Sequence, residues 1–190
     1  MSPGPSANRA SPPDETLRPL RRVRQIREFT DESITEEELA AIADAARWSG
    51  SSANEQPWRF ILIRVAGTLL RLAEAGSPQT RSLRTASAAI AIAVPDEKDR
   101  AVSRAYDEGR AAERILIAAS FLGLGGGIAW IRSDARDAPR EILGLPPDWL
   151  VRTIVALGHP SESARRPKSK PGEGRRPRQE TVFEERWPKS

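Results

Sequence analysis

The chain has 190 residues, a formal net charge of +4, no cysteine and one histidine. This length is enough for one compact domain with a sizeable core. The lack of cysteine excludes disulfides, thiolate metal sites and cysteine nucleophiles, and it fits the cytoplasm. A single imidazole, His159, excludes sites that need two, so no metal site is predicted. No apolar stretch has the length of a membrane-spanning helix, so no membrane partner is expected.

Both ends of the chain differ in composition from its middle. Residues 1–16 are rich in Pro, Ser and Ala and contain no apolar run, which predicts a disordered tail and not a signal peptide. Residues 17–190 form the expected folded domain. Within it, 161–178 is a basic arm that can attract phosphate or nucleic acid, unless it is a solvated linker. Its seven cations, against Glu162 and Glu173, are Arg165, Arg166, Lys168, Lys170, Arg175, Arg176 and Arg178.

Apolar periodicity predicts a succession of helices and strands. Thr35 and Glu38 form a capping-box signature, and the helical spacing behind them predicts a helix over 36–48. The strand predicted over 58–65 is apolar on both faces, which favours a central position in a sheet. Further helices are expected at 69–75, 100–122 and 137–144, further strands at 88–94, 128–131 and 150–157, and a last apolar segment at 181–183. This order favours a layered α+β domain.

Arg24 and Arg27 are the first candidates for binding chemistry. Two guanidiniums three residues apart repel each other unless an anion lies between them. Phosphate suits this role because its oxygens match the guanidinium fork. The alternative is a solvated basic turn in which Glu28 is the partner.

Two other stretches offer groups suited to a ligand. Ser51, Ser52, Asn54 and Gln56 lie in a polar loop, where paired donors and acceptors suit the edge of a heterocycle, unless they only satisfy their own turn. The glycine-rich stretch 123–127 lets the backbone approach a ligand closely, or else caps a helix and turns. It is not a dinucleotide fingerprint, because it follows a helix and precedes a strand.

The order and spacing of these stretches resemble the nitroreductase family from residue 20 to residue 187. The chain departs from the family pattern at Val23, Gln25 and Gly50, where Arg, Ser and Pro are usual. The matching motifs are Arg24-x-x-Arg27-x-Phe29, Ser51-x-x-Asn54-x-Gln56-Pro57-Trp58, Asp107-x-Gly109-x-Ala111, Gly123-Leu124-Gly125, Leu157-Gly158-x-Pro160 and Arg175-x-Pro177.

The resemblance implies a fold, an assembly and an activity. The fold is a three-layer α-β-α sandwich with a central mixed or antiparallel sheet. The assembly is a homodimer with one FMN at each interface, each site drawing on both chains. The activity is hydride transfer from NADH or NADPH to an electron-poor small molecule, such as a nitroaromatic or a quinone, by a ping-pong mechanism. No catalytic side chain is required, because the cofactor carries the chemistry.

The resemblance also assigns roles to individual residues. Arg24 and Gln25 are expected at the phosphate and ribityl chain, and Arg27 at the pyrimidine end of the flavin. Ser51, Ser52 and Asn54 are expected to hold the ring and ribityl chain. A backbone amide near flavin N5 is expected from the stretch that contains Gly126, Trp130 and Ile131, and Arg175 is expected to return to the phosphate.

Two other functions stay open. A protein of this fold can have a specialised task, such as dehalogenation, flavin destruction or deazaflavin use. The connection between the second strand and the long helix is short, which leaves the site open and favours a generalist reductase. A polyanion-binding module is the second alternative, but the basic arm 161–178 contains no aromatic residue for base stacking, so no nucleic acid partner is expected.

Overall fold

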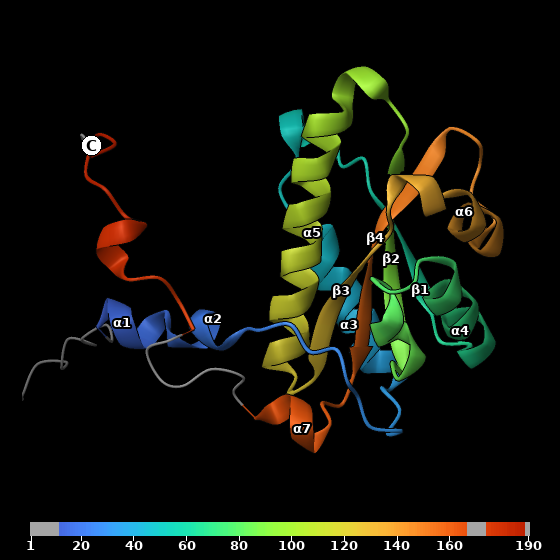
Figure 1. Cartoon of the computed structure of the whole chain (residues 1–190), viewed down its shortest axis with the longest axis horizontal. Helices are drawn as coiled ribbons and strands as arrows, with labels where there is room; N and C mark the ends of the chain where they lie inside the picture. Colours follow the sequence, from blue (N-terminus) through green and yellow to red (C-terminus); the bar gives the residue numbers. More distant parts are fainter. Residues whose placement is uncertain (1–11, 167–173, 189–190) are drawn as a thin grey trace, which may run out of the picture.

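A four-stranded sheet forms the centre of the molecule, and the computed structural model describes residues 12–166 and 174–188 (Figure 1). The strand order is β1-β2-β4-β3, and each neighbouring pair is antiparallel. The strands are β1 Arg59–Ile63, β2 Ala88–Pro95, β3 Gly125–Trp130 and β4 Trp149–Gly158.

The alternation of side chains along β2 explains how the sheet separates two cores. Ile90, Ile92 and Val94 face one core, while the small Ala89 and Ala91 face the other. Successive residues of a strand point to opposite faces, so one strand supplies both. All six non-terminal residues of β2 are buried, as expected of a strand in the middle of a sheet.

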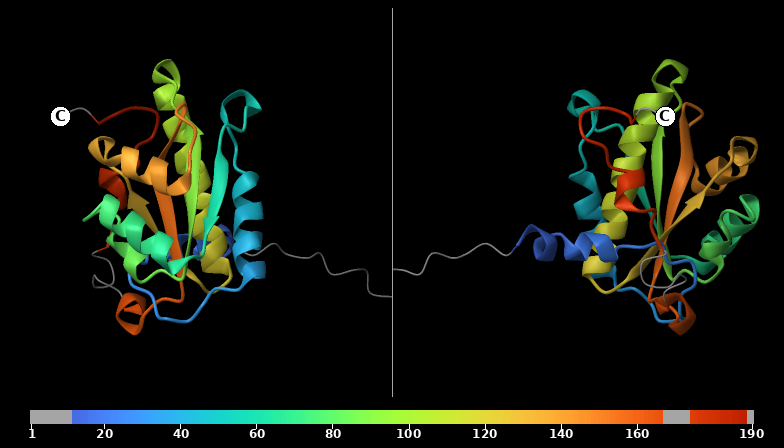
Figure 2. Two further views of the ribbon diagram at one scale, coloured as in Figure 1. Left: turned by 90° about the vertical axis from the view of Figure 1, so that its right-hand side faces the viewer. Right: turned by 60° about the vertical axis from the view of Figure 1, so that its left-hand side comes forward.

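Helices cover both faces of the sheet, as Figure 2 shows from two sides. The helices α3 Glu36–Arg47 and α5 Ala101–Phe121 pack on one face with the first core. The helices α4 Ala66–Ala75 and α6 Asp137–Leu143 and the 3-10 helix η2 Arg81–Arg84 pack on the other. The predicted three-layer α-β-α sandwich is confirmed, and the sheet is antiparallel.

Most predicted elements are confirmed to within a few residues of their ends. The capping box of α3 is present, with Glu38 accepting from the Thr35 amide at 2.9 Å. The short helix predicted over 69–75 begins three residues earlier, at Ala66. The apolar segment 181–183 forms no strand.

Two predictions about strands are wrong. β1 lies at an edge of the sheet and not at its centre. Its Phe60 packs against the α5 side, and Ile61 and Ile63 pack against the α4 side. Because helices pack against part of each face, this edge strand has apolar residues on both faces, as a central strand does. The third strand begins at Gly125 and ends at Trp130, whereas 128–131 was predicted.

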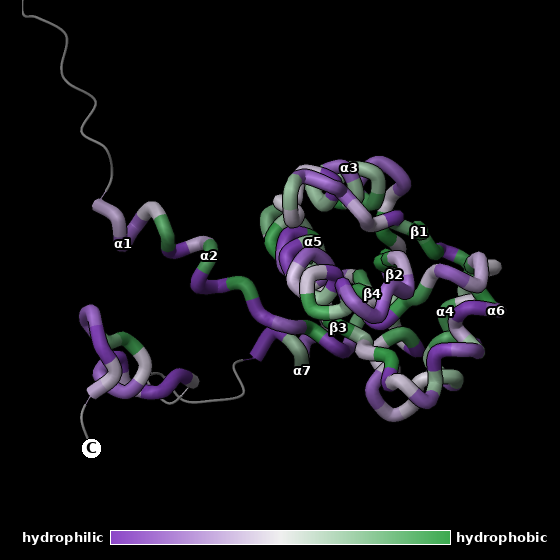
Figure 3. The backbone as a smooth tube through the Cα atoms, turned by 90° about the horizontal axis from the view of Figure 1, so that it is seen from above, coloured by the Kyte–Doolittle hydropathy of each residue, from purple (hydrophilic) through white to green (hydrophobic). Residues whose placement is uncertain are grey.

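Short helices occur toward the ends of the described chain and in the connections between its larger elements. They are α1 Pro13–Thr16, α2 Arg18–Arg22, α7 Glu162–Arg165, and the 3-10 helices η1 Ser52–Asn54, η3 Lys98–Arg100, η4 Ser133–Ala135 and η5 Arg178–Glu180. Residues 1–11 of the predicted tail lie outside the described residues, but its last four residues form α1. Viewed from above, α1, α2 and 174–188 lie apart from the sheet and its helices (Figure 3).

Candidate functional site

Residues 23–30, which we call the N-terminal strap, run along the outer edge of β3. Gln25 forms a parallel bridge with Gly126, whose carbonyl oxygen accepts from the Ile26 amide at 2.7 Å. The side-chain oxygen of Gln25 accepts from the Ile128 amide at 3.1 Å. Ile26 and Phe29 are buried. These contacts fix the backbone on either side of Arg27.

Glycines allow the strap to lie this close to the sheet. A Cβ atom on Gly127 would stand 2.1 Å from the carbonyl oxygen of Ile26, and one on Gly158 would stand 2.9 Å from the Phe29 side chain. The predicted tight turn after α5 is present at Gly123, with φ 76°. Glycines 125–127, by contrast, lie within β3, where they accommodate the strap. Gly126 is buried, and its carbonyl is already occupied.

The two arginines of the strap have different surroundings. The Arg27 guanidinium is exposed and donates to the neutral side-chain oxygen of Gln25 at 2.9 Å. The Arg24 guanidinium donates to the carbonyl oxygen of Arg165. The carboxylate of Glu28 accepts from the Ser163 hydroxyl at 2.8 Å. The interpretation in which Glu28 is the partner of these arginines is therefore wrong.

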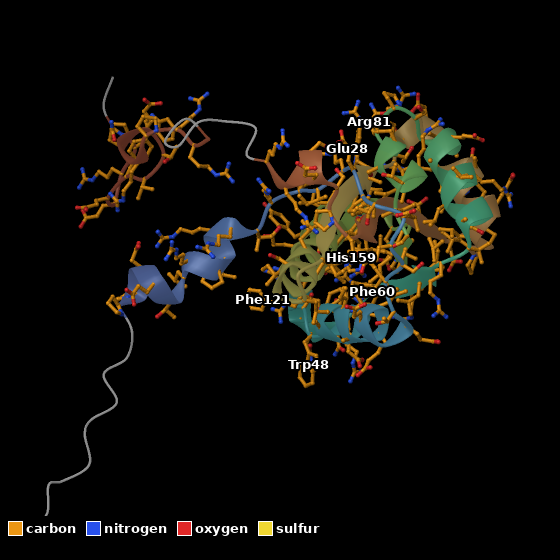
Figure 4. The ribbon with its side chains drawn as sticks, turned by 90° about the horizontal axis from the view of Figure 1, so that it is seen from below. Glu28, Trp48, Phe60, Arg81, Phe121 and His159 are labelled. Carbon is orange, nitrogen blue, oxygen red and sulfur yellow. The ribbon has the colours of Figure 1, made fainter. Side chains whose placement is uncertain are left out.

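An open cleft of about 300 Å³ lies beside Arg27. Its lining residues are Arg27, Pro78, Gln79, Arg81, Ile128 and Trp130. Gln79 comes from the turn after α4 and Arg81 begins η2, and sequence reasoning missed both. No local pattern distinguishes Arg81 from its neighbours Arg71 and Arg84. Only the packing of η2 near β3 brings Arg81 to the cleft, and Figure 4 shows its side chain at the surface.

The backbone of β3 offers a donor to this cleft. Along an antiparallel strand, successive amides alternate between the partner strand and the outer side. The Ile131 amide donates to the carbonyl oxygen of Arg152 in β4 at 2.8 Å, and the Ile128 amide donates outward to Gln25. The Trp130 amide therefore points to the outer edge. The Trp130 side chain is 50% exposed, whereas Ile131 is fully buried.

Residues 51–56, which we call the polar loop, are bound to the beginning of α5. The Ser52 amide donates to Asp107 Oδ1 at 3.0 Å, and Glu55 Oε2 accepts from Arg104 at 2.8 Å. Hydrogen bonds from Arg100 and Arg104 hold the pKa of Glu55 below its ordinary value of 4.5. The side chains of Ser52 and Asn54 are exposed.

Within one chain the polar loop and the strap remain separate. Gln25 lies beside Gly126, just after α5 ends, while the loop is bound near the beginning of α5 (Figure 1). Among residues 12–166 and 174–188 no hydrogen bond or ion pair joins the two. The structure thus brings Gln25, Arg27 and Trp130 together, but does not bring Ser51, Ser52 or Asn54 to them.

Arg175 has no hydrogen bond or ion pair to the strap among the described residues. It belongs to the described segment 174–188, which lies apart from the sheet (Figure 3), and its guanidinium donates to the carbonyl oxygen of Gly174 at 2.8 Å. Part of the basic arm, 167–173, lies outside the described residues. In its described part, Arg166 forms an ion pair with Glu162 at 2.5 Å.

Comparison with known proteins identifies the family. The model of the nitroreductase family matches residues 20–86. A relative from Archaeoglobus fulgidus, provisionally named NADH dehydrogenase/NAD(P)H nitroreductase, is 34% identical over 155 residues, which cover 78% of this chain and 87% of the relative. The chain belongs to the nitroreductase family. It is accordingly an oxidoreductase.

Other nitroreductases agree with this assignment. A relative from Methanothermobacter thermautotrophicus with the same provisional name is 27% identical over 154 residues, covering 78% of this chain and 79% of the relative. A solved structure of an FMN-dependent nitroreductase from Clostridium difficile is 25% identical in sequence, with a TM-score of 0.78, and the match covers 89% of this chain and 98% of that one. The part matched by the family model contains the strap, the polar loop and η2.

The described part of the chain shows neither a metal centre nor a membrane span. Among residues 12–166 and 174–188 no group of His, Asp and Glu is arranged to hold a metal ion. In the same part of the chain, no helix has the length and apolar character needed to cross a membrane.

Proposed function

We propose that this nitroreductase binds FMN in the cleft between the strap, η2 and β3. The observation that carries the proposal is the set of groups lining that cleft. Arg27 and Arg81 supply two guanidiniums, Trp130 supplies a half-exposed indole, and the outer edge of β3 supplies a free amide. A flavin mononucleotide has a flat aromatic ring, a polar pyrimidine edge and a phosphate, and this set of donors fits such a ligand.

The charge of the cleft supports the same ligand. The hydrogen-bond partner of Arg27 is the neutral Gln25, and Arg81 has no ion pair within the described part of the chain. No carboxylate lines the cleft. Two like charges without a counter-ion favour an anion between or beside them. We therefore add Arg81 to the proposed cofactor-binding residues.

The proposed contacts follow from which backbone and side-chain groups are available. Arg27 and Arg81 face the pyrimidine edge, and Gln25 and Arg24 lie toward the ribityl chain and phosphate. The Trp130 amide is the proposed donor to flavin N5, because the Ile131 amide already donates to the carbonyl oxygen of Arg152. Gly126 contributes by binding the strap, because its carbonyl oxygen accepts the hydrogen bond from the Ile26 amide.

In the proposed reaction, FMN supplies the hydride chemistry: when bound, it takes a hydride from NADH or NADPH and passes it to an electron-poor acceptor, such as a nitroaromatic or a quinone, in a ping-pong cycle. The guanidiniums of Arg27 and Arg81 favour added negative charge at the pyrimidine edge. Only residues 96–100 join β2 to α5, and so short a connection supports an open site that both substrates can enter in turn. No proton transfer by a side chain is required.

A second copy of the chain completes the proposed site. The strap and the polar loop both carry family motifs, yet they remain separate in one chain. Trp48 and Phe121 are 73% and 64% exposed, and Figure 4 shows both projecting outward from the helices α3 and α5. Large apolar side chains exposed together mark an interface. A homodimer would cover them and supply the polar loop of one chain to the FMN of the other.

The names of similar proteins support the choice of cofactors. The Clostridium difficile protein is named as FMN-dependent, and the two archaeal relatives are named for NAD(P)H. The expected compartment is the cytoplasm, which cell fractionation would test.

The proposal is tested by reconstituting the purified chain with FMN. A bound flavin spectrum, followed by oxidation of NADH or NADPH that depends on a nitroaromatic or a quinone, is the expected result. A chain that takes up no FMN, or that takes up only a deazaflavin, would contradict it.

A further inference from the structure

The polar loop has a backbone conformation that its own sequence does not favour. Ala53, Asn54 and Gln56 have φ values of 48°, 55° and 51°. Residues other than glycine are uncommon in this left-handed region, and their backbone is strained there unless their surroundings determine it. Since Ser52, Ala53, Asn54 and Gln56 are exposed, packing of these side chains into the core does not hold the loop.

Side chains at the beginning of α5 hold the loop on both sides of its left-handed pair, Ala53 and Asn54. Before the pair, the Ser52 amide donates to Asp107 Oδ1 at 3.0 Å. After the pair, Glu55 accepts from Arg104 at 2.8 Å and from Arg100. Residues 104 and 107 are three apart, so their side chains lie on one side of the helix.

The side chains of Arg104 and Asp107 in α5 are unusually buried for charged groups. The side chain of Arg104 is 5% exposed and that of Asp107 is 1% exposed. Arg104 also donates to Glu97 at 2.6 Å, which fixes its orientation. Asp107 Oδ2 has no hydrogen-bond partner among the described residues. Burying a carboxylate without full hydrogen bonding is costly, so general packing does not account for Asp107.

We propose that Asp107 and Arg104 are positioning residues that clamp the polar loop in the conformation required to meet the cofactor. They act through Ser52 and Glu55 and touch no cofactor themselves. The clamp fixes the direction of the Asn54 side chain, whose oxygen is 3.3 Å from Gln56 Nε2 and whose amide group is left to donate. This inference rests on the proposed FMN function.

The experiment compares Asp107→Ala with Asp107→Asn in the full chain. Alanine removes the acceptor of the Ser52 amide, whereas asparagine keeps an oxygen that can accept it. Without this acceptor for the Ser52 amide, the polar loop is released, and FMN binding should weaken by about tenfold or more. The asparagine variant should stay within about threefold of the wild type. Asp137→Ala, which breaks an exposed ion pair with Arg140 on α6, is the matched control.

Amide hydrogen exchange without flavin tests the clamp independently of FMN. In Asp107→Ala, peptides covering 50–58 should exchange faster, while peptides from β2 and β4 should not change. Glu55→Ala gives a second test outside the core, because Glu55 is exposed and its removal releases the far side of the loop. It should also speed exchange in the loop.

The outcomes separate the clamp from the proposed function. Unchanged exchange in the loop of both alanine variants would overturn the clamp. Equal loss of FMN in the alanine and asparagine variants would also overturn it, because a positioning role requires rescue by the retained oxygen. Faster loop exchange in a chain that binds no FMN would contradict the proposed function and leave the clamp intact.

Discussion

At the scale of single residues, Arg27 is the side chain whose charge should matter most to the proposed cofactor. Its backbone is fixed by Gln25 and Ile26, and its guanidinium is permanently charged. Arg27→Gln keeps polarity and removes the charge. A charge-assisted contact is worth about 1.5–3 kcal/mol, so the variant should lower the midpoint potential of bound FMN and slow its reduction by the nicotinamide.

A potentiometric titration and single-turnover reduction would measure both effects. Arg27→Lys is the matched control, because it keeps the charge and should keep most of the potential. If Arg27→Gln retains full FMN occupancy and an unchanged potential, Arg27 is structural.

Residue by residue, the sequence indicated the strap better than the rest of the site. Arg27 could be proposed as a site residue because a local motif contains it, and Gln25 because it lies within the same motif stretch. Arg81 could not, since only the packing of η2 near β3 brings it to the cleft. The burial of Arg104 and Asp107 was not predicted either, because burial of a charged side chain depends on partners distant in sequence, such as Glu55 and Ser52.

At the scale of elements, the N-terminus of α3 offers a stability prediction. Glu38 accepts hydrogen bonds from the backbone amide and the hydroxyl of Thr35. Both bonds, the backbone one more strongly, lower the pKa of Glu38 below its ordinary value of 4.5. A lowered pKa in the folded state means that this stabilisation is complete above 4.5 and is lost as the pH falls through the folded value.

Glu38→Ala should therefore destabilise the protein by about 1 kcal/mol more than Glu37→Ala at neutral pH. Both variants remove a carboxylate from the first turn of α3, but only Glu38 belongs to the capping box. Denaturant unfolding at neutral and acidic pH measures the difference, which should shrink as the solution becomes acidic. A difference that does not depend on pH would show that ionisation of Glu38 is irrelevant.

The elements also show what periodicity can and cannot predict. The capped helix α3 and the long helix α5 could be placed to within one residue, because an amphipathic stripe and a cap are local properties. The position of β1 in the sheet could not, because an edge strand covered on both faces has the pattern of a central strand. The role of the glycines of β3 could not be predicted for a similar reason. Whether a backbone or a ligand lies against Gly127 depends on the strap, which is distant in sequence.

At the scale of the whole molecule, the position of Arg175 bears on how the two chains share the site. Its segment, 174–188, lies apart from the sheet (Figure 3), so we expect that Arg175 reaches the phosphate through a movement of this segment or from the partner chain. Arg175→Ala should weaken FMN binding by about tenfold, the cost of one charge-assisted contact. Arg166→Ala is the matched control and should change binding little, because Arg166 is exposed and paired with Glu162.

Equilibrium titration with FMN measures both variants. If the two lose affinity equally, the basic arm acts as diffuse charge and Arg175 has no specific role.

The assembly of two chains is the prediction on which the complete site depends. The inner side of α5 packs in the first core, whereas Tyr106 and Phe121 on its outer side are 69% and 64% exposed. Trp48, which directly follows α3, is 73% exposed. A groove of about 640 Å³ that includes Gly50, Tyr106 and Gly109 runs along the same outer side. Exposed aromatic side chains and small residues on one helix suit a twofold helix-to-helix contact.

Sedimentation should therefore give twice the chain mass of 20.9 kDa. Phe121→Asp places a charge in the proposed contact and should shift the protein toward monomer, weakening FMN binding by more than about tenfold because the polar loop of the second chain is lost. Leu70→Asp is the matched control: Leu70 is 45% exposed on α4, which covers the opposite face of the sheet, so this variant should remain dimeric and bind FMN normally. A stable monomer that holds FMN as tightly as the wild type would contradict the shared site, because every group needed for binding would then lie within one chain.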